Sequence, residues 1–208
     1  MLTQSVTLFH APDTRSTAAL ILLEELGVEY QLQVLNLKKR EQRRRVYRAI
    51  NPMGKVPALQ HGETLITEQV AVLLYLADLY PQADLAPPIG DPLRGAYLRW
   101  MVYYGTCFEP AIIDRWQKRE PAPSAMSPYG DFKTMFKTLT DQLGKGPYLL
   151  GGKFAAVDVL WATALTWITP FQLLPVLPVI DAYIERVNVR PAVVRARAKD
   201  AELAAAQG

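Results

Sequence analysis

Cysteine is nearly absent from this sequence: among its 208 residues, only Cys107 carries a thiol. A single cysteine excludes an internal disulfide and a CxxC redox pair, and it fits a reducing compartment. Histidine is almost as scarce, because His10 and His61 are the only two and lie far apart. With no spacing typical of metal ligands, the sequence predicts no metal site.

Long apolar runs and a strong excess of one charge are also missing. No uninterrupted run reaches the roughly 18 residues that a membrane span needs, and the first residues lack the charged start and apolar core of a signal peptide. The net charge is only +3, which does not indicate a polyanionic partner. We therefore expect a cytoplasmic protein with no nucleic-acid and no membrane partner.

What the sequence does contain is an ordinary globular composition, with half of its residues hydrophobic and about a fifth charged. The first 80 residues alternate between strand and helix signals. We expect strands at 6–9, 30–35, 56–59 and 64–66, helices at 18–26 and 68–80, and a polar, helix-permissive stretch at 38–50. The helix at 68–80 is apolar on nearly all faces, which predicts that it is largely buried. This order predicts an α/β unit with a small mixed sheet.

The composition changes at Pro81, where prolines and a glycine follow one another over a dozen residues. Such a stretch is typical of a linker between domains. Beyond it we expect only helices, at 93–116, 128–143, 157–168, 176–187 and 192–206. The predicted organisation is an α/β domain at 1–80, a linker at 81–92 and an all-helical domain at 93–208.

The turn between the first strand and the first helix carries several hydroxyl groups. A helix N-terminus stabilises an anion, including a thiolate. Lowering the pKa of a thiol by about 2 units takes roughly 2.7 kcal/mol, and one hydrogen bond to a charged group supplies ~1.5–3 kcal/mol. A hydroxyl here therefore suffices to activate a bound thiol. The alternative is simple N-capping, which by itself is the commoner role of such residues: Asp13, Thr14, Ser16 and Thr17.

A second polar segment surrounds Val56-Pro57 and the start of the next helix. A cis bond before Pro57 would turn the main chain of Val56 outward, where it would pair with an extended peptide. Glu68 suits a ligand ammonium group, and Gln69 with the helix N-terminus suits a carboxylate. The alternative is that Thr67 caps the helix and Glu68 only interacts with its dipole. Both interpretations stay open from the residues alone.

The ordered set of motifs resembles the glutathione transferase superfamily over essentially the whole chain. Residues 51–59 resemble the family pattern NPxGxVPxL, residues 67–76 resemble TE(S/x)xAIxxYL, and residues 154–158 resemble the capping motif F(S/T)xAD. The resemblance implies a thioredoxin-like N-terminal domain, a helical C-terminal domain, a cis Pro57 and a homodimer. It also implies glutathione as co-substrate, with no metal.

Three positions depart from the family patterns. His10 stands where several classes carry Tyr, and Arg15 stands where cysteine-type bacterial members carry their nucleophile. Thr14 falls where serine-type members carry the hydroxyl that faces the thiolate. The resemblance therefore makes Thr14 the first choice for the catalytic residue, with Ser16 second and His10 third.

Two further residue sets follow from the resemblance. The glutathione-binding set is Lys39, Lys55, Val56, Pro57, Glu68 and Gln69. For Lys39, which would bind the glycyl carboxylate, a solvated basic face is the alternative. The set for a hydrophobic substrate pocket is Tyr103, Tyr104, Cys107 and Trp167. Interior packing is the alternative for these residues.

The function that these expectations support is conjugation of the glutathione thiolate to small apolar electrophiles, in the manner of a detoxification enzyme. A glutathione-dependent peroxidase or disulfide reductase is the first alternative, although Arg15 in place of a cysteine argues against protein-thiol chemistry. A non-catalytic relative with the same fold, kept as a binding or scaffolding protein, is the second.

Overall fold

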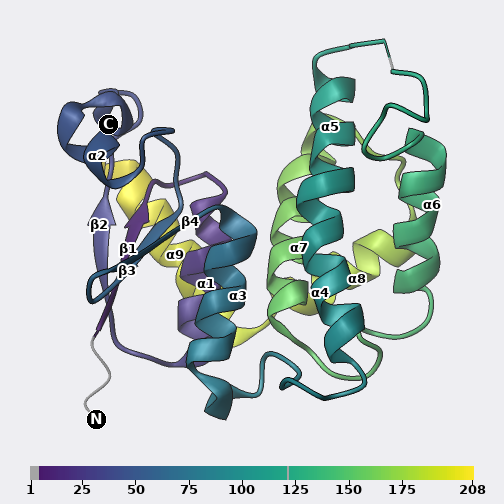
Figure 1. The fold of residues 1–208 in the computed structure, drawn as a ribbon, viewed down its shortest axis with the longest axis horizontal. Helices are drawn as coiled ribbons and strands as arrows, with labels where there is room; N and C mark the ends of the chain where they lie inside the picture. Colours follow the sequence, from purple (N-terminus) through teal and green to yellow (C-terminus); the bar gives the residue numbers. More distant parts are fainter. Residues whose placement is uncertain (1–4, 121) are drawn as a thin grey trace. The chain divides into compact units, whose positions relative to one another are not determined.

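The computed structural model describes residues 5–120 and 122–208, which divide into two compact units. The first unit comprises the chain up to Asp84 together with Val189–Gly208, and the second comprises Leu85–Asn188. The first unit contains the sheet, and the second is built from helices (Figure 1). The predicted fold class, a thioredoxin-like α/β part followed by a helical part, is confirmed.

The first unit is built on a mixed sheet of four strands in the order β2-β1-β3-β4. Strands β1 (Val6–His10) and β2 (Tyr30–Val34) are parallel, whereas β3 (Ala58–His61) is antiparallel to β1 and to β4 (Thr64–Thr67). These strands lie within two residues of the predicted ones. Strand β1 is internal to the sheet and buries four of its five residues. Its last residue, His10, therefore lies in the interior of the unit.

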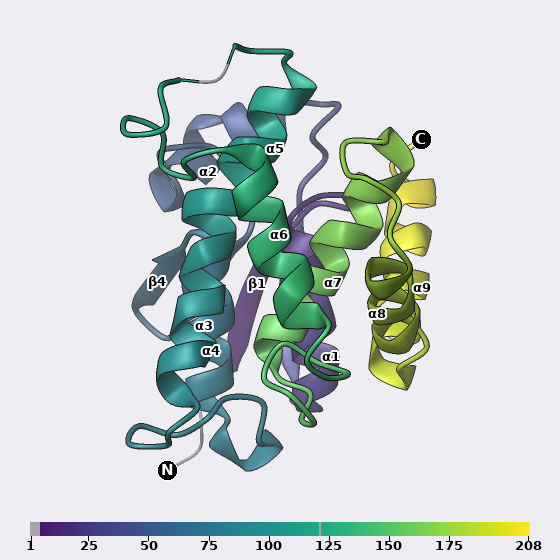
Figure 2. The same ribbon diagram turned by 90° about the vertical axis from the view of Figure 1, so that its right-hand side faces the viewer.

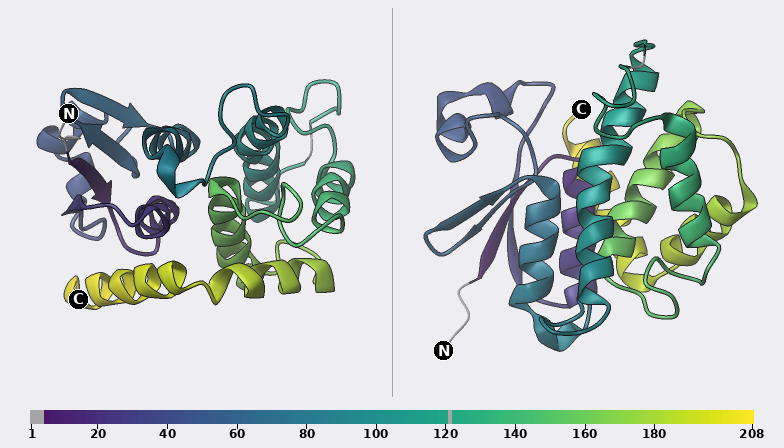
Figure 3. Two further views of the ribbon diagram at one scale, coloured as in Figure 1. Left: turned by 90° about the horizontal axis from the view of Figure 1, so that it is seen from below. Right: turned by 45° about the vertical axis from the view of Figure 1, so that its right-hand side comes forward.

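Helix α1 (Ser16–Leu26) is the central helix of this unit. Nine of its 11 residues are buried, and it ends at Gly27, whose φ of 65° is the left-handed conformation that glycine adopts readily. Helices α3 (Gln69–Leu79) and α9 (Pro191–Ala206) both pack against α1. The left view of Figure 3 shows α9 running alongside this unit.

The prediction that helix 68–80 is largely buried is wrong for part of its surface. The buried residues of α3 are Val72, Leu73, Leu76 and Ala77. Ala71 and Asp78, on another side of the helix, are exposed. An apolar sequence shows that a helix can be buried, but packing against α1 and the sheet decides which face is covered.

The polar stretch at 38–50 forms two short pieces, a 3-10 turn at Glu41–Arg43 and helix α2 at Arg45–Ile50. Tyr47 is the buried residue of α2, and its ring lies 5.8 Å from that of Phe9 in β1. A second 3-10 turn, Pro81–Ala83, follows α3.

The second unit contains helices α4 (Arg94–Tyr103), α5 (Glu109–Trp116), α6 (Phe132–Leu143), α7 (Ala156–Ile168) and α8 (Pro178–Asn188) (Figure 2). A 3-10 turn at residues 169–171 follows α7. These helices agree with the expected ones to within a few residues. Helix α7 buries ten of its 13 residues and contacts both α4 and α8, so it forms the core of the unit.

A π-helical turn, Tyr104–Phe108, joins α4 to α5 where the sequence predicts one continuous helix. Pro110 supplies the reason, because proline has no N–H to donate to the carbonyl four residues earlier and its ring crowds that carbonyl. A wider turn just before the proline relieves this conflict, and π turns in helices occur often at functional sites.

Helix α9 follows the helical unit in sequence but packs with the first unit. Arg190, just before α9, forms a two-point ion pair with Glu25 of α1, with distances of 2.6 and 2.8 Å. The compact first unit therefore contains residues from the far end of the predicted domain 93–208. The domain boundaries at 80 and 93 stay a prediction.

Candidate active site at the turn between β1 and α1

The chain turns sharply between β1 and α1. Asp13 has a φ of 55°, in the left-handed region that Asp tolerates better than most residues. Its N–H donates to Oδ2 of Asp200, at 3.2 Å. The N–H of Ala11 donates to Oγ of Ser16, at 3.1 Å. Both ends of the turn are thus fixed by side chains.

Two hydroxyl groups meet in this turn. Oγ1 of Thr14 lies 2.7 Å from Oγ of Ser16, and each hydroxyl also lies within donating distance of the Ala11 carbonyl, at 2.7 and 3.1 Å. Ser16 is completely buried, whereas Thr14 is half-buried. A ligand that approaches this turn therefore meets the Thr14 hydroxyl first, with Ser16 behind it.

His10 completes the group behind the hydroxyls. Its side chain is fully buried, and Nδ1 lies 2.8 Å from Oγ of Ser16. The main-chain carbonyl of His10 accepts the N–H of Leu35, at 2.8 Å, which holds the end of β1. The three residues predicted as catalytic candidates are thus in one connected chain of contacts: Thr14, Ser16 and His10.

Asp200 of α9 is the fourth member of this group. Its Oδ1 lies 2.7 Å from Nε2 of His10, and neither atom has a hydrogen-bond partner elsewhere in the described residues. Its Oδ2 accepts the hydroxyl of Thr17, at 2.9 Å, besides the N–H of Asp13. The carboxylate therefore binds the histidine with one oxygen and the start of α1 with the other.

The electrostatics of Asp200 follow from these contacts. Burial alone raises the pKa of a carboxyl group, but here the contact with His10 and the hydrogen bonds from Asp13 and Thr17 outweigh burial. The pKa of Asp200 is lowered, so the group is a carboxylate at neutral pH. The carboxylate thus places a negative charge beside the imidazole of His10.

Sequence analysis missed Asp200, because its partners Thr17 and Asp13 lie 183 and 187 residues earlier in the chain. One signal was present. Val193, Ala196 and Asp200 follow one another at the spacing of a buried helical stripe, and all three are buried. An acidic residue on such a stripe needs a partner, which marks it as worth explaining.

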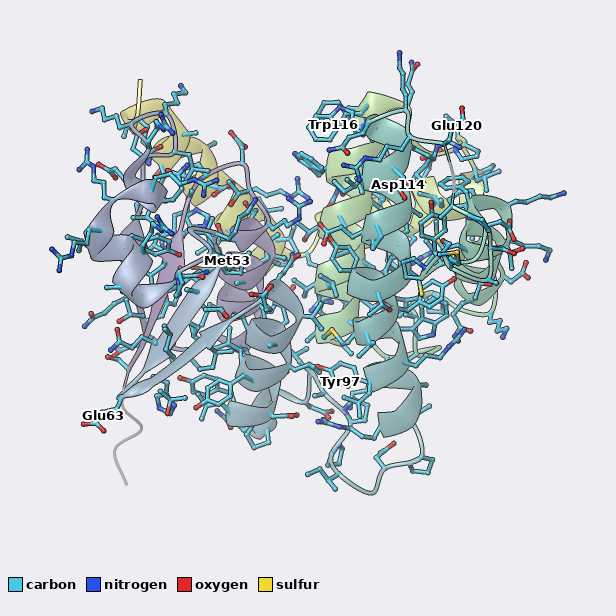
Figure 4. The ribbon with its side chains drawn as sticks, turned by 45° about the horizontal axis from the view of Figure 1, so that its top comes forward. Met53, Glu63, Tyr97, Asp114, Trp116 and Glu120 are labelled. Atoms are coloured by element: carbon cyan, nitrogen blue, oxygen red, sulfur yellow. The ribbon has the colours of Figure 1, made fainter. Side chains whose placement is uncertain are left out.

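The second predicted segment contains the cis peptide bond between Val56 and Pro57 that the resemblance implies. The carbonyl of Lys55 just before it accepts two hydrogen bonds, from the Tyr47 hydroxyl at 2.6 Å and from Nδ2 of Asn51 at 2.9 Å. Burial raises the pKa of Tyr47 to about 12, so this hydroxyl remains a donor. Met53, in the turn before this bond, is 65% exposed (Figure 4). Val56 lies two residues before the start of β3 and outside the pairing of β3 with β4.

Glu68 and Gln69 stand at the start of α3. Glu68 has a φ of 68°, a backbone conformation that costs energy for a residue other than glycine and is frequent at functional sites. Nε2 of Gln69 donates to the carbonyl of Arg15, at 3.0 Å, which ties this segment to the β1–α1 turn. Oε1 of Gln69 is buried and has no hydrogen-bond partner among the described residues. The side chain therefore offers an acceptor, whereas the sequence suggested a donor for a carboxylate.

The lysines of the predicted binding set are exposed. The N–H of Lys39 donates to Oδ1 of Asn36, at 2.9 Å, which fixes its main chain and leaves the side chain on the surface. Lys55 is also exposed, beyond its fixed carbonyl. Their assignment to glutathione stays a prediction.

The predicted pocket residues lie in the second unit and have different surroundings there. Tyr103 stacks on Trp161, and its hydroxyl donates to the carbonyl of Met135, at 3.1 Å. Tyr104 is buried, 5.6 Å from the same indole ring. Cys107, half-buried in the π turn, lies 3.5 Å from the Pro128 carbonyl. The two tyrosines have the contacts of core residues.

Trp167 differs from these residues because it is 45% exposed and contacts Phe171, with ring centroids 5.3 Å apart. Further exposed aromatic surface lies at the end of α5, where Trp116 is labelled near Asp114 and Glu120 (Figure 4). The assignment of all four predicted residues to a substrate pocket stays a prediction.

The described residues contain no group of three or more His, Cys, Asp or Glu side chains placed to hold a metal ion. Within the same residues, no helix has the length and apolar character needed to cross a membrane.

A thioredoxin-like unit whose first turn presents hydroxyl groups, joined to a helical unit, defines a class of glutathione-dependent proteins, and comparison with known proteins agrees. The family model "Glutathione S-transferase, N-terminal domain" matches residues 4–78, and "Glutathione S-transferase, C-terminal domain" matches residues 110–186. The chain is 30% identical to "Glutathione S-transferase GstA" of Escherichia coli O157:H7, over 89% of this chain and 94% of the relative.

Other relatives and structures extend the comparison. "Disulfide-bond oxidoreductase YfcG" of Escherichia coli K12 is 26% identical over 93% of this chain and 95% of its own. The crystal structure of a glutathione transferase from Methylococcus capsulatus has a TM-score of 0.80 and 30% identity, covering 95% of this chain and 99% of that one. A sphingomonad glutathione S-transferase complexed with glutathione has a TM-score of 0.76 at 28% identity, covering 94% and 98%. The chain belongs to the glutathione transferase family.

Proposed function

We propose that this protein binds glutathione in its first unit and conjugates the thiolate to small apolar electrophiles. Family membership supports glutathione transferase activity in general, and the geometry of the β1–α1 turn supports the particular reaction. The observation that carries the proposal is the half-buried Thr14 hydroxyl, which is fixed by Ser16 at 2.7 Å beside the start of α1. The Thr14 hydroxyl donates to the Ala11 carbonyl, at 2.7 Å, and would turn to a sulfur atom bound beside it.

The energetics fit this role. A thiol with a pKa near 8.5 is only a few per cent ionised at neutral pH. One charge-assisted hydrogen bond contributes about 1.5–3 kcal/mol and the helix terminus about 0.3–1 kcal/mol. Together they lower the pKa of the thiol by about 2 units, which makes most of the bound glutathione a thiolate.

The tripeptide itself would lie along the second segment. We place its cysteinyl backbone against the main chain of Val56, next to the cis Pro57, and its γ-glutamyl end at Glu68 and Gln69. Oε1 of Gln69, which has no hydrogen-bond partner among the described residues, would accept from the ammonium group of that end once the side chain turns toward it. Lys39 and Lys55 would face the glycyl carboxylate. The hydrogen bond from Gln69 to Arg15 supports the proposal, because it joins this segment to the turn.

The reaction replaces a leaving group on the electrophile. With a chloronitroaromatic substrate, the sulfur forms a bond to the ring carbon, the C–Cl bond breaks and chloride leaves. The enzyme contributes thiolate stabilisation and proximity. The electrophile would bind near the predicted pocket residues Tyr103, Tyr104, Cys107 and Trp167.

Conjugation of glutathione to a chloronitroaromatic tests this function. We expect Thr14→Ala to lower kcat/KM about 10- to 100-fold, the equivalent of a lost hydrogen bond to a charged group. Ser16→Ala is expected to have a similar or larger effect. Thr64→Ala, which removes an exposed hydroxyl on β4, serves as the matched control and should leave the rate unchanged. Full activity in both turn variants would contradict the site assignment.

A glutathione-dependent peroxidase or reductase is the second candidate, favoured by the similarity to a relative described as a disulfide-bond oxidoreductase. Bound thiolate would reduce a hydroperoxide to an alcohol and water while two glutathione molecules form one disulfide. Turnover of cumene hydroperoxide faster than conjugation would favour this function. A protein that is not retained on immobilised glutathione would instead be a non-catalytic relative.

We also propose that the protein acts as a homodimer in the cytoplasm, as the resemblance implies. Light scattering of the purified protein tests the assembly, and cell fractionation tests the location.

A further inference from the structure

Hydrogen bonding to a thiolate requires only the Thr14 hydroxyl, but an imidazole and a carboxylate lie behind it as well. Four polar side chains form an unbroken line: Thr14, Ser16, His10 and Asp200. Successive distances along it are 2.7, 2.8 and 2.7 Å. The last three have the order and contacts of a hydroxyl, an imidazole and a carboxylate in a catalytic triad. Here the serine is buried and only the threonine at the end of the line is reachable.

Counting hydrogens shows what this line can do. Asp200 is a carboxylate, so Nε2 of His10 carries a hydrogen. With a neutral imidazole, Nδ1 is then an acceptor. The Ser16 hydroxyl can donate to Nδ1, and the Thr14 hydroxyl can donate to Ser16 or to the Ala11 carbonyl. With neutral His10, both hydroxyl hydrogens thus have acceptors within the protein, and the two hydroxyls can donate one after the other toward Nδ1.

The balance changes when His10 is an imidazolium. Nδ1 then donates to Ser16, and the Ser16 hydroxyl can donate to the Ala11 carbonyl, 3.1 Å away. With Ser16 bonded to that carbonyl, the hydroxyl of half-buried Thr14 can turn to a ligand. A proton on the ring thus accompanies a hydroxyl donor for an anion at Thr14.

We propose that the proton of the bound glutathione thiol is passed through the Thr14 and Ser16 hydroxyls to Nδ1 of His10 and is kept there by Asp200. The inference rests on the proposed function. The S–H bond breaks as Thr14 takes that hydrogen, Thr14 gives its own hydrogen to Ser16, and Ser16 gives its hydrogen to Nδ1. No electrons are exchanged, and the thiolate ends opposite a buried imidazolium. Thr14 touches the sulfur. His10 and Asp200 do not touch it and act through Ser16 and Thr14, as positioning residues.

Asp200 supplies the charged side chain that contacts the ring of His10. Strands β1 and β2 carry no Asp, Glu, Lys or Arg, and the acidic residues of α1 lie at its far end. Asp13 contacts the carboxylate through its main chain. From α9, Arg197 interacts electrostatically with Asp200 one turn away. The carboxylate is thus the charged group in direct contact with the ring.

Two measurements on glutathione binding test the relay. Thiolate formation is followed by its ultraviolet absorbance, and proton release is followed by calorimetry in buffers of different ionisation enthalpy. For the wild-type protein near neutral pH, we expect a thiolate to form with almost no proton released to the buffer. S-methylglutathione has no thiol proton, so its binding should release the same small number of protons to the buffer.

Asp200→Asn keeps the shape of the side chain and removes its charge. We expect about a ten-fold fall in the ratio of thiolate to thiol at a fixed pH, with thiolate that does form now releasing its proton to the buffer. Binding of S-methylglutathione should change little. Glu25→Gln is the matched control, because it makes the same change in a carboxylate that also links α1 to the α9 segment but does not contact His10. Glu25→Gln should leave both the thiolate absorbance and the number of released protons unchanged.

The outcomes separate this inference from the proposed function. A thiolate that forms with release of about one proton per site in the wild-type protein would overturn the relay and leave the transferase function intact. An unchanged thiolate titration in Asp200→Asn would overturn it as well. No binding of either peptide by the wild-type protein would remove the proposed function itself.

Discussion

Asp158 and Asp200 are both buried carboxylates that accept hydrogen bonds at the start of a helix, α7 for Asp158 and α1 for Asp200, but their partners differ in kind. Asp158 accepts the N–H groups of Ala155 and Leu149, both at 2.9 Å, and the hydroxyl of Tyr183, at 2.8 Å. Asp200 accepts an N–H and a hydroxyl as well, but its other oxygen faces the imidazole of His10.

The difference between the two sites lies in which groups can exchange protons. Burial, together with the charge of Asp158, raises the pKa of Tyr183 well above its usual value, so that hydroxyl keeps its hydrogen at all ordinary pH. Asp158 thus has partners that do not titrate, which suits a structural role. Asp200 has the imidazole of His10 as a partner, and a ring nitrogen can take up a proton. Asp158 therefore only stabilises the fold, whereas Asp200 lies beside a ring that can accept a proton.

The largest effect that we expect on stability comes from removing the structural carboxylate. Asp158→Ala leaves buried donors without an acceptor, at a cost of about 1 to 3 kcal/mol each, so the free energy of unfolding should fall by about 3 kcal/mol or more. Urea unfolding measures it. Asp181→Ala, at an exposed position in the first turn of α8, is the control and should cost less than about 1 kcal/mol. Equal losses of stability in the two variants would show that the buried hydrogen bonds to Asp158 do not stabilise the fold.

Asp200→Asn should lower the free energy of unfolding by about 2 kcal/mol at neutral pH, the value of hydrogen bonds to a charged group. The pH dependence sharpens the comparison. The folded protein lowers the pKa of Asp200, so its contribution is complete above about pH 4 and is lost as the pH falls through the folded-state value. The difference between wild type and variant should therefore shrink on acidification below pH 4. A difference that stays constant there would contradict this assignment of charge.

Glu25→Gln tests how much of the attachment of α9 depends on charge alone. The pair with Arg190 is two-pointed, and Glu25 is largely buried while Arg190 is 30% exposed. We expect a loss of about 1 kcal/mol, between the values for surface and buried pairs. Raising the salt concentration should reduce this loss more than the loss in Asp200→Asn, because screening acts mainly on exposed charges. The same salt dependence in both variants would show that the Glu25–Arg190 pair is no more exposed to screening than the contacts of Asp200.

The two aspartates also show what sequence analysis could and could not find. Asp158 and Ala155 are three residues apart in a recognisable capping motif, so the contact between them followed from the local sequence. The cluster of Thr14, Ser16 and His10 was equally local, within seven residues. The cis bond before Pro57 was expected from the resemblance and is present.

What the sequence did not predict depends on contacts between distant segments. Asp200 reaches the β1–α1 turn from the other end of the chain, and Gln69 reaches Arg15 across 54 residues. No spacing rule encodes such contacts, because they arise only when α3 and α9 pack against α1. The exposed face of α3 was missed for the same reason: hydrophobic periodicity describes a helix and leaves its neighbours unspecified.

The smallest effect concerns the hydroxyl that is missing from the capping motif. Ala155 occupies the N-cap of α7 with an extended backbone, and Asp158 already accepts its N–H. Half of a capping box is thus present: the N–H of Asp158 donates to the main-chain carbonyl of Ala155, at 2.8 Å, and has no side-chain oxygen to share that hydrogen bond. Ala155→Ser supplies that oxygen and should raise the free energy of unfolding by about 0.5 to 1 kcal/mol. When Asp158 is also replaced by Ala, the serine can still accept the N–H of residue 158, but the reciprocal bond to the N–H of residue 155 is lost. The increase in the free energy of unfolding should then persist at a reduced size. A gain of zero in both backgrounds would mean that the buried position has no room for the hydroxyl, and that the motif in this chain is complete with one half.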